Sequence, residues 1–332
     1  MRAQVLERPG PVATGEPMRL RDVPDPAPGA GELLLRVAAC AVCRTDLQLV
    51  EGDLPAHRLP TIPGHQVVGR VEAVGAGVAG WSPGDRAAVG WLAGTCGTCA
   101  ACRAGRENLC REARFTAWDR DGGFAERMTV RADVALAVPD GFDDLDAAPL
   151  LCGGVIGYRS LLVSGIRPGG RLGLYGFGAS ALLAIQVARH WGCEVHVATR
   201  SPRERARALE LGAASVGGYD DPPPAPLDAA VTFAPVGSVV VAALRALERG
   251  GTVAINAIHL DGIPAFPYDD LWWERGLRSV ANSTVADARA FLALAAEIPV
   301  RTAIDVRPLA EGADALRRLA TGAGEGTAVL VP

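Results

Sequence analysis

Four cysteines lie close together in the first half of the chain. They follow the spacing Cys-x2-Cys-x2-Cys-x7-Cys, as Cys96, Cys99, Cys102 and Cys110. Four soft sulfur ligands at such short spacing suit tetrahedral Zn²⁺ with no open coordination position. An iron–sulfur cluster is the alternative for the same ligands. We predict a structural zinc site, which does no chemistry and stabilises a lobe that has little core of its own.

Three more residues could hold a second metal ion, although they lie far apart in the sequence. Cys43, His65 and Cys152 would supply two thiolates and one imidazole and would leave one position free for water or substrate. An open fourth position is typical of a catalytic zinc site. From the residues alone an alternative remains, because a lone cysteine is usually a small buried hydrophobic residue.

A glycine-rich segment in the second half of the chain is typical of dinucleotide binding. It follows a strand predicted over 171–175 and opens a helix predicted over 179–191. Its first glycine permits a tight turn, its second lets the backbone approach a pyrophosphate, and the start of the helix offers N–H groups. The residues expected at the phosphates are Gly176, Gly178, Ala179 and Ser180.

The turn after the next predicted strand bears on the choice of cofactor. This strand, over 194–199, ends in Thr199-Arg200-Ser201-Pro202, with no Asp or Glu where an NAD-binding fold usually has one. A small hydroxyl followed by an arginine suits a 2′-phosphate, so we expect NADP(H) in preference to NAD(H). The alternative is that Arg200 is a solvated residue at the start of a helix.

Two kinds of segment must position these residues. Up to about residue 150 the chain predicts strands with many turns, for example over 32–39 and 66–74. Beyond it, strands alternate with helices, which implies a parallel, doubly wound α/β sheet. We therefore expect a catalytic domain over 1–150 and 296–332, and a dinucleotide-binding domain over 151–295.

The composition excludes several classes of function. The chain of 332 residues has a net charge of −4 and hence no basic surface for nucleic acid. We see no apolar run long enough to span a bilayer and no signal peptide, so we expect a cytoplasmic protein. All 33 of its Lys and Arg residues are arginines, which excludes a mechanism with a Schiff-base lysine.

These motifs occur in the order found in a known family, which the chain resembles over nearly its full length. It is similar to the zinc-containing alcohol dehydrogenases of the medium-chain dehydrogenase/reductase superfamily. The resemblance implies a GroES-like β-rich catalytic domain beside a Rossmann-type domain, and a catalytic zinc on Cys43, His65 and Cys152. It also implies that Thr45 binds the substrate oxygen and that Asp46 orients His65. Arg44 is expected at the cofactor.

The chain departs from the family pattern at two positions. Gln66 replaces the Glu that usually follows the zinc-binding histidine, so an oxygen remains but a charge is lost. Gln48 replaces a proton-relay histidine, and a glutamine cannot titrate near neutral pH. The proton must then pass through water, the cofactor ribose or another group. His57 is close in sequence, but we interpret it as an exposed loop residue.

The expected reaction is hydride transfer between a neutral alcohol and its aldehyde or ketone. Trp91 and Trp118 are candidates for an aromatic substrate pocket, and Tyr268 with Leu271-Trp272-Trp273 could line a pocket or a subunit contact. Alternatives are a reductase of conjugated double bonds, favoured by the missing relay, a carbonyl reductase of specialised metabolism, and a redox sensor without turnover. We also expect a small-molecule substrate and a homo-oligomeric protein, either a dimer or a tetramer.

Overall fold

The computed structural model describes residues 1–298, 300–324 and 326–332, and the chain divides into two units. Unit 1 comprises Met1–Cys152, Thr284–Ala296 and Arg301–Pro332, and unit 2 comprises Gly153–Ser283 and Glu297–Val300. The structure groups residues 284–295, which the sequence predicts in the dinucleotide-binding domain, with unit 1. Helix α9 (Val285–Glu297) explains the difference, because the backbone N–H of Val285 donates to Oε1 of Glu107 at 2.8 Å.

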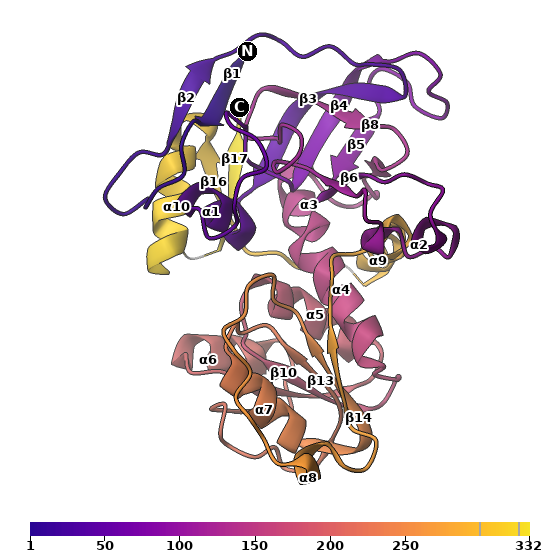
Figure 1. The fold of residues 1–332 in the computed structure, drawn as a ribbon, viewed down its shortest axis with the longest axis vertical. Coiled ribbons are helices and arrows are strands. Elements are labelled where there is room, and N and C mark those ends of the chain that lie inside the picture. Colours follow the sequence, from indigo (N-terminus) through magenta and orange to yellow (C-terminus); the bar gives the residue numbers. More distant parts are fainter. Residues whose placement is uncertain (299, 325) are drawn as a thin grey trace. The chain divides into compact units, whose positions relative to one another are not determined.

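Unit 1 contains a seven-stranded sheet, which Figure 1 shows in its upper part. The strand order is β16-β17-β3-β4-β5-β9, and β8 also pairs with β3. Pairing is antiparallel except between β16 and β17. In β3, Leu33, Leu35 and Val37 are buried on the face that meets the core. The bounds are β3 Glu32–Ala41, β4 Val67–Val74, β5 Arg86–Val89, β8 Arg127–Arg131, β9 Leu136–Ala137, β16 Ile304–Pro308 and β17 Thr327–Val331.

Smaller elements complete unit 1 and carry most of its candidate site residues. Two further pairs of strands are antiparallel, β1 with β2 and β6 with β7. Their bounds are β1 Arg2–Leu6, β2 Met18–Asp22, β6 Leu92–Gly94 and β7 Arg114–Phe115. The helices are α1 Arg44–Glu51, α2 Ala100–Arg103, η1 Glu107–Leu109, α3 Asp144–Ala147, η2 Ala148–Leu151, α9, η3 Leu309–Glu311 and α10 Gly312–Thr321.

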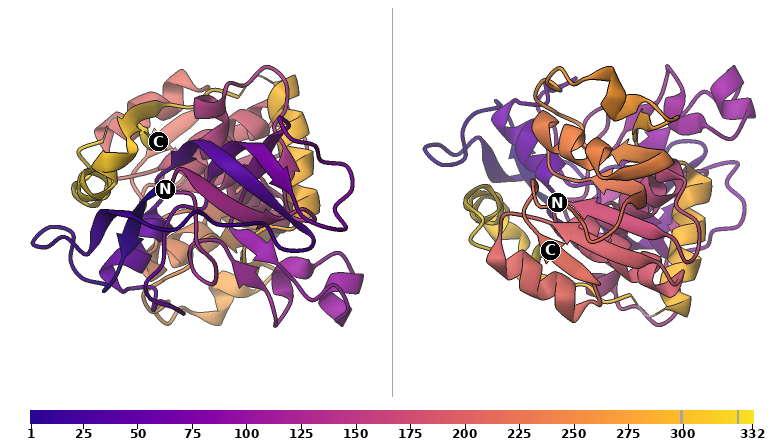
Figure 2. Two further views of the ribbon diagram at one scale, coloured as in Figure 1. Left: turned by 90° about the horizontal axis from the view of Figure 1, so that it is seen from above. Right: turned by 90° about the horizontal axis from the view of Figure 1, so that it is seen from below.

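Unit 2 contains six parallel strands in the order β12-β11-β10-β13-β14-β15. Helices lie on both faces of this sheet, as Figures 1 and 2 show, and the expected Rossmann-type, doubly wound architecture is confirmed. The strands are β10 Arg171–Tyr175, β11 Glu194–Ala198, β12 Ser215–Gly217, β13 Leu227–Thr232, β14 Leu247–Ile255 and β15 Gly276–Ser279. The helices are α4 Gly153–Ser164, α5 Ala179–His190, α6 Pro202–Glu210, α7 Gly237–Arg245 and α8 Tyr268–Leu271.

The strand order reverses direction next to β10, the first strand of the sheet in sequence. From β10 the chain proceeds outwards through β11 and β12, then crosses back to β13 on the other side of β10. In doubly wound sheets, ligands bind at the carboxyl ends of the strands beside this reversal. The turns that follow β10 and β11 are therefore the part of unit 2 that we describe with the site.

One helical stretch, Asp144–Ser164, corrects our expectation about membrane spans. By length and composition it could cross a membrane, although 67% of its most apolar window is buried inside the protein. It combines α3, η2 and α4, and buried residues such as Leu150 and Leu161 explain its apolar character. Burial of this kind is typical of a core helix, so the stretch is weak grounds for a membrane segment.

Candidate metal centres and cofactor site

The sulfur atoms of the four clustered cysteines lie close together in unit 1, at separations that suit tetrahedral coordination of one ion. Sγ of Cys96 lies 3.5 Å from Sγ of Cys110 and 3.9 Å from Sγ of Cys102. Sγ of Cys99 lies 3.5 Å from Sγ of Cys102, and all four sulfurs fall within 4.8 Å of one another. Four sulfurs bonded to one zinc ion at about 2.3 Å lie about 3.8 Å apart, so these distances fit that ion.

Local backbone geometry brings these sulfurs together. Cys99 precedes α2, and its sulfur accepts the backbone N–H of Cys102 at 3.5 Å. Gly97, with φ of +72°, takes the left-handed conformation that the tight turn requires. Backbone N–H groups of Thr98 and Cys99 lower the pKa of the Cys96 thiol to about 6. Four thiolates this close repel one another, so the full set needs a cation.

The second group of candidate ligands also meets in unit 1. Sγ of Cys43 lies 3.9 Å from Sγ of Cys152, and the ligand atoms of these cysteines and His65 lie within 4.8 Å of one another. The two sulfurs come from the residue before α1 and the residue after η2, and the imidazole from the segment that leads into β4. Residues 109 positions apart in the sequence are thus neighbours.

His65 is positioned for metal binding by its neighbour Asp46. Nδ1 of His65 lies 3.0 Å from Oδ1 of Asp46, and both side chains are 1% exposed. Among the described residues, the buried Nε2 of His65 has no hydrogen-bond partner. A buried polar atom without a partner is costly, and a metal ion between this nitrogen and the two sulfurs would satisfy it.

Charges in this group are strongly coupled. Burial disfavours the imidazolium of His65, but the Asp46 carboxylate and the Cys43 thiol outweigh burial and raise the pKa of His65 to about 10. Hydrogen bonding to Cys152 holds the pKa of Cys43 well below its usual range, and the same contact, with burial, raises that of Cys152. The group thus holds one thiolate and one imidazolium. A divalent cation would bind there by displacing protons.

Thr45, Gln66 and Gln48 lie near this group in different ways. The hydroxyl of Thr45 is buried and lies 3.9 Å from Sγ of Cys43. Gln66 is also buried, and its Nε2 lies 3.4 Å from the carbonyl oxygen of Ala41. Gln48 belongs to α1, four residues before the glycine that ends that helix. The structure therefore places Thr45 beside a candidate ligand and Gln66 in the core next to another.

Gly64, directly before His65, has no room for a side chain. Its φ is +94°, and a Cβ atom there would lie 2.8 Å from Sγ of Cys40 and would also collide with the ring of Phe124. The backbone N–H of Gly64 donates to Oδ1 of Asp46 at 3.1 Å. The glycine therefore lets the backbone pass between the core and the carboxylate that orients the imidazole.

Aromatic rings extend from His65 towards the surface of unit 1. The ring centroid of Trp91 lies 6.3 Å from that of His65 and 6.0 Å from that of Trp118. Phe115, which the sequence analysis missed, contacts both tryptophans, with centroid distances of 4.6 and 5.7 Å. Its position is visible only in three dimensions, since no pattern links it to Trp91.

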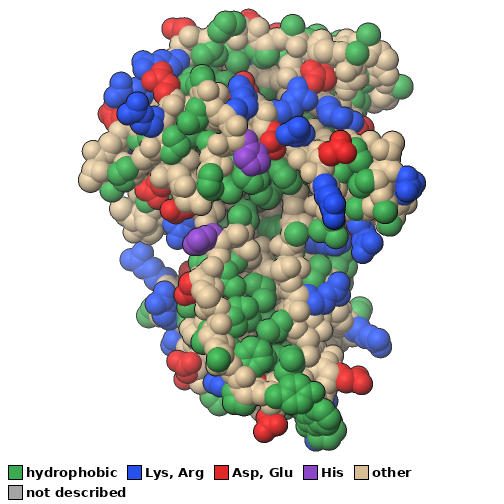
Figure 3. Space-filling view, in the orientation of Figure 1, with side chains coloured by type: hydrophobic (Ala, Val, Ile, Leu, Met, Phe, Trp, Pro, Cys, Tyr) green, Lys and Arg blue, Asp and Glu red, His purple; other side chains and the backbone are tan. Residues whose placement is uncertain are grey.

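His57 is an exposed loop residue, as expected, and it also contacts the aromatic rings. It is 48% exposed, but its ring stacks on Trp118 at a centroid distance of 3.8 Å. Its Nδ1 lies 2.8 Å from Oδ1 of the buried Asp119. The other aromatic candidates lie in unit 2, where Tyr268, Trp272 and Trp273 are exposed; Figure 3 shows hydrophobic side chains gathered on the surface around α8.

The glycine-rich turn between β10 and α5 has the geometry expected for phosphate binding. Gly176 has φ of +89°, and a Cβ there would lie 2.8 Å from the backbone nitrogen of Ala234. Gly178 directly precedes α5 as its N-cap residue, and apart from its chain neighbours no atom lies within 4 Å of the place where its Cβ would be. Ala179 and Ser180 form the first turn of α5. The helix start is thus open, as close approach of a pyrophosphate requires.

The turn after β11 contains a carboxylate that the sequence analysis did not expect. The hydroxyl of Thr199 donates to the carboxylate of Glu204, which lies in the first turn of α6. Ser201 caps α6 by accepting the backbone N–H of Glu204 at 3.3 Å. Arg200 is exposed, and its Cζ lies 6.0 Å from the ring centroid of Tyr219. Arg44, the remaining cofactor candidate, belongs to unit 1 and is exposed in the first turn of α1.

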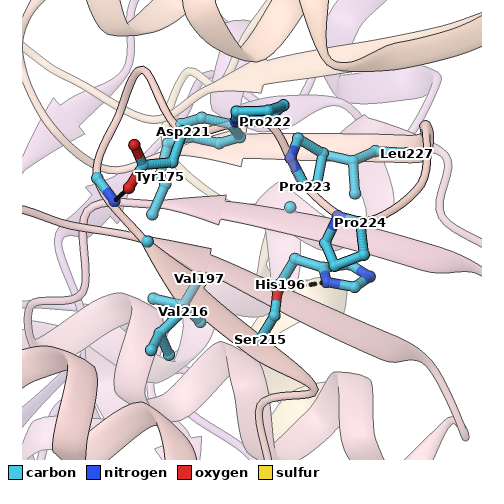
Figure 4. A pocket seen from close by; sticks show the side chains of 14 residues that line it. Tyr175, His196, Val197, Ser215, Val216, Asp221, Pro222, Pro223, Pro224 and Leu227 are labelled. Carbon is cyan, nitrogen blue, oxygen red and sulfur yellow. Dashed lines mark hydrogen bonds between the residues drawn. The ribbon is translucent and has the colours of Figure 1, made fainter.

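Unit 2 also contains a pocket of about 170 Å³, whose lining includes Tyr175, the residue directly before the glycine-rich turn (Figure 4). Strands β10, β11 and β12 line it together with Pro222–Pro224, where the short β12–β13 connection crosses the sheet without a helix in its described residues. Within it, Nδ1 of His196 lies 2.8 Å from Oγ of Ser215. Its lining includes none of the predicted cofactor residues.

Comparisons with known proteins agree with this geometry. The family model "Alcohol dehydrogenase GroES-like domain" matches residues 29–140, and the model "Zinc-binding dehydrogenase" matches residues 179–297. The Mycobacterium tuberculosis (strain CDC 1551 / Oshkosh) protein named "Probable alcohol dehydrogenase AdhA" is 52% identical, over 100% of this chain and 97% of its own length.

Two solved structures show the same fold. A cobalt- and zinc-bound thermostable alcohol dehydrogenase from Pyrobaculum aerophilum is 26% identical, with a TM-score of 0.90, over 100% of this chain and 99% of its own. A structure described as a zinc-binding dehydrogenase from Sinorhizobium meliloti 1021, bound to NADP, is 29% identical with a TM-score of 0.88, over 100% and 99% of the two chains.

Proposed function

Because this chain belongs to the zinc-type medium-chain dehydrogenase/reductase superfamily, we propose that it is a zinc-dependent alcohol dehydrogenase. Its relatives support an oxidoreductase that acts on alcohols or carbonyl compounds. The proposed reaction transfers hydride between a neutral alcohol and its aldehyde or ketone, with NADP(H) preferred over NAD(H). The observation that carries the proposal is the buried Nε2 of His65, which lacks a partner among the described residues beside two cysteine sulfurs.

The donor set fits a catalytic zinc ion. Cys43, His65 and Cys152 would hold it with two sulfurs and one nitrogen and would leave one position for the substrate oxygen. When bound, zinc supplies Lewis acidity that lowers the pKa of an alcohol oxygen. The Asp46 carboxylate keeps a proton on Nδ1 of His65, so that Nε2 presents its lone pair.

Thr45 is the residue that we propose to handle the proton of the alcohol. Its hydroxyl lies 3.9 Å from Sγ of Cys43, within the reach of a substrate oxygen bound among the ligands. A hydroxyl can accept one proton while it donates its own, so it can pass the proton outwards. Gln48 cannot titrate, so the next carrier is water or a cofactor ribose hydroxyl.

The four-cysteine group is proposed to hold a second, structural zinc ion. Cys96, Cys99, Cys102 and Cys110 fill a tetrahedron completely, so no position remains for a substrate. The lobe that carries them contains only α2, η1 and short turns, with few buried apolar side chains. The ion would therefore act on stability and not on the chemistry.

Unit 2 is proposed to bind the nicotinamide cofactor, with unit 1 as the catalytic domain. Gly176, Gly178, Ala179 and Ser180 would contact the pyrophosphate at the start of α5. Arg200, with Thr199 and Ser201, would meet a 2′-phosphate after β11. A bound cofactor supplies the hydride donor or acceptor.

We further propose a cytoplasmic homo-oligomer, of which the dimer is the basic form. Among the described residues, strand β15 pairs only with β14, which leaves the other edge of a six-stranded sheet open. Trp272 and Trp273 are half-exposed shortly before that edge strand, as an interface residue would be in an isolated chain. All eight cysteines are free thiols in the structure, which suits a reducing compartment.

A substrate panel on protein with measured zinc content tests the proposal. Short, branched and aromatic alcohols, their aldehydes and matching enones would be assayed with each cofactor. We expect wild type to oxidise alcohols and to reduce aldehydes, and we expect both activities to be absent in Cys43→Ser. Reduction of enones alone would replace the proposal with the double-bond reductase, and no turnover of any compound by zinc-replete protein would favour the sensor.

A further inference from the structure

The turn after β11 contains groups of opposite charge around one hydroxyl. Thr199 is 2% exposed; its backbone N–H donates to Gly217 at 2.9 Å, and its carbonyl oxygen accepts Nε of Arg205 at 2.8 Å. Its hydroxyl donates to the carboxylate of Glu204. Thr199 is therefore fixed on every side, and its orientation is not free to change when a cofactor arrives.

The bond between Thr199 and Glu204 determines what the hydroxyl can do next. A hydroxyl has one hydrogen, and a carboxylate can only accept it. The oxygen of Thr199 therefore keeps only lone pairs, and the backbone N–H of Ser201, 3.4 Å away, and the side chain of Tyr219 are already hydrogen-bonding neighbours of this residue. The carboxylate of Glu204 keeps further lone pairs to which a ribose hydroxyl can donate, whereas an ionised phosphate, which also accepts hydrogen bonds, finds no donor there.

The position of Glu204 is not explained by capping of α6 alone. In a capping box, the third helical residue accepts the backbone N–H of the N-cap residue. Here that N–H, of Ser201, is directed at Thr199, and the carboxylate of Glu204 instead accepts the threonine hydroxyl. The carboxylate is thus held at the end of β11, where a cofactor's adenosine ribose is expected.

We propose that Glu204 acts through Thr199 as a specificity-determining residue that disfavours a 2′-phosphate and keeps NADH usable. The inference rests on the proposed dinucleotide function of unit 2. Arg200 and Arg203, both exposed, attract a 2′-phosphate to this turn, while Glu204 repels it and offers acceptors to ribose hydroxyls. The chain would therefore use both cofactors, with Glu204 as the group that limits its preference for NADP(H).

Calorimetry with nucleotide fragments isolates the 2′-phosphate from the rest of the reaction. The zinc-replete protein would be titrated with 2′,5′-ADP and with 5′-AMP, for wild type, Glu204→Gln and Glu210→Gln. Glu210 lies on the same helix, exposed and paired with Arg207 at 2.8 Å, so its variant controls for the loss of one negative charge. Glu204→Ala replaces Glu204→Gln if the latter fails to fold, as judged by thermal melting.

We expect Glu204→Gln to bind 2′,5′-ADP about tenfold more tightly, the effect of removing one like-charge contact near the surface. Binding of 5′-AMP should change less than twofold, and Glu210→Gln should match wild type with both fragments. The ratio of the Michaelis constants for NADPH and NADH should fall in parallel in Glu204→Gln.

Three results would overturn the inference in distinguishable ways. Equal binding of 2′,5′-ADP by wild type and Glu204→Gln would refute the role of Glu204 but leave the cofactor site in place. If Glu210→Gln gained the same affinity for 2′,5′-ADP as Glu204→Gln, the effect would come from the total charge of the protein and not from the position of Glu204. If neither fragment binds to wild type, the proposed dinucleotide site fails, and the inference fails with it.

Discussion

The carboxylate of Asp46 lies 3.0 Å from Nδ1 of His65 and also accepts two backbone N–H groups. Its Oδ2 accepts the N–H of Cys43 at 2.9 Å, and its Oδ1 accepts that of Gly64 at 3.1 Å. One buried side chain therefore fixes the backbone beside two candidate metal ligands and the tautomer of one of them. Mutations at Asp46 should act on the metal centre without touching the metal itself.

The metal-free protein should become less stable as the pH rises above about 9. Burial disfavours the charged form of His65, yet Asp46 and Cys43 raise its pKa from 6.5 to about 10. Because the folded-state pKa of His65 is the higher one, its contribution to stability is fully present below about pH 6.5 and is lost as the pH passes through about 10. The lowered pKa of Cys43 contributes the opposite slope up to its usual value of 9.0, so the net decline is expected above about pH 9. Thermal melting of chelator-treated protein above this pH measures the loss.

Asp46→Asn provides the control for this pH dependence. Without the carboxylate the pKa of His65 falls, so the variant should show a shallower decline than wild type over the same range. The variant should also bind zinc about 10- to 100-fold more weakly, as expected for loss of the residue that orients a ligand. A wild-type melting temperature that rises over this range would contradict the assignment.

Freshly purified protein should contain two zinc ions per chain. The two groups supply seven protein ligands and one open position. Cys43→Ser should abolish alcohol oxidation with little change in melting temperature, since the remaining contacts of α1 persist. Cys99→Ser should instead lower the melting temperature or the yield of soluble protein. Metal analysis that finds at most one tightly held ion would be incompatible with the two-site proposal.

Restoring a glutamate at position 66 should increase turnover more than it increases zinc affinity. Gln66 is buried directly after His65, and it keeps an oxygen but lacks the charge that the family usually has there. The lost charge is expected to affect exchange of ligands at the metal and not its retention. Turnover of Gln66→Glu that equals wild type or falls below it would refute this role.

Removal of Arg200 should affect the two cofactors differently. Each charge-assisted hydrogen bond to an arginine contributes about 1.5–3 kcal/mol, so Arg200→Ala should weaken the binding of NADPH roughly ten- to a hundredfold. NADH has no 2′-phosphate, so its binding should hardly change. Michaelis constants for both cofactors in wild type and variant provide the measurement. Equal losses, or a wild-type preference for NADH, would make Arg200 a solvated turn residue.

Local spacing predicted those parts of the site in which neighbouring residues act together. The four clustered cysteines and the turn at Gly176 were recognisable because each is complete within a short segment. Cys152 lies 109 residues from Cys43, so only the order of motifs in a related family connected the two. The two sheets could be predicted because the alternation of apolar residues in strands and their helical periodicity in helices each extend over several residues.

The parts that were missed depend on side-chain contacts that no sequence pattern reveals, whether the partners lie far apart, as for α9, or close together, as for Thr199 and Glu204. Helix α9 was assigned to the wrong unit because its bond to Glu107 spans 178 residues. Glu204 was overlooked because its carboxylate reaches back from a helix to the end of a strand. The contacts of the exposed His57 with Trp118 and Asp119 were not foreseen, because neither residue is near it in sequence. Side-chain direction, which no spacing rule supplies, decided all three.

The lack of space at Gly64 has a consequence for how this protein can evolve. Even alanine, the smallest replacement, would bring a methyl group to 2.8 Å from Sγ of Cys40 while holding the backbone at a φ of +94°. Changing Cys40 and Phe124 would not make room for a side chain, because the Cβ would also lie 2.8 Å from the backbone nitrogen of residue 124. In a library of single substitutions, codon 64 should therefore tolerate as little variation as the codon of the adjacent metal ligand, although Gly64 itself has no side chain with which to react.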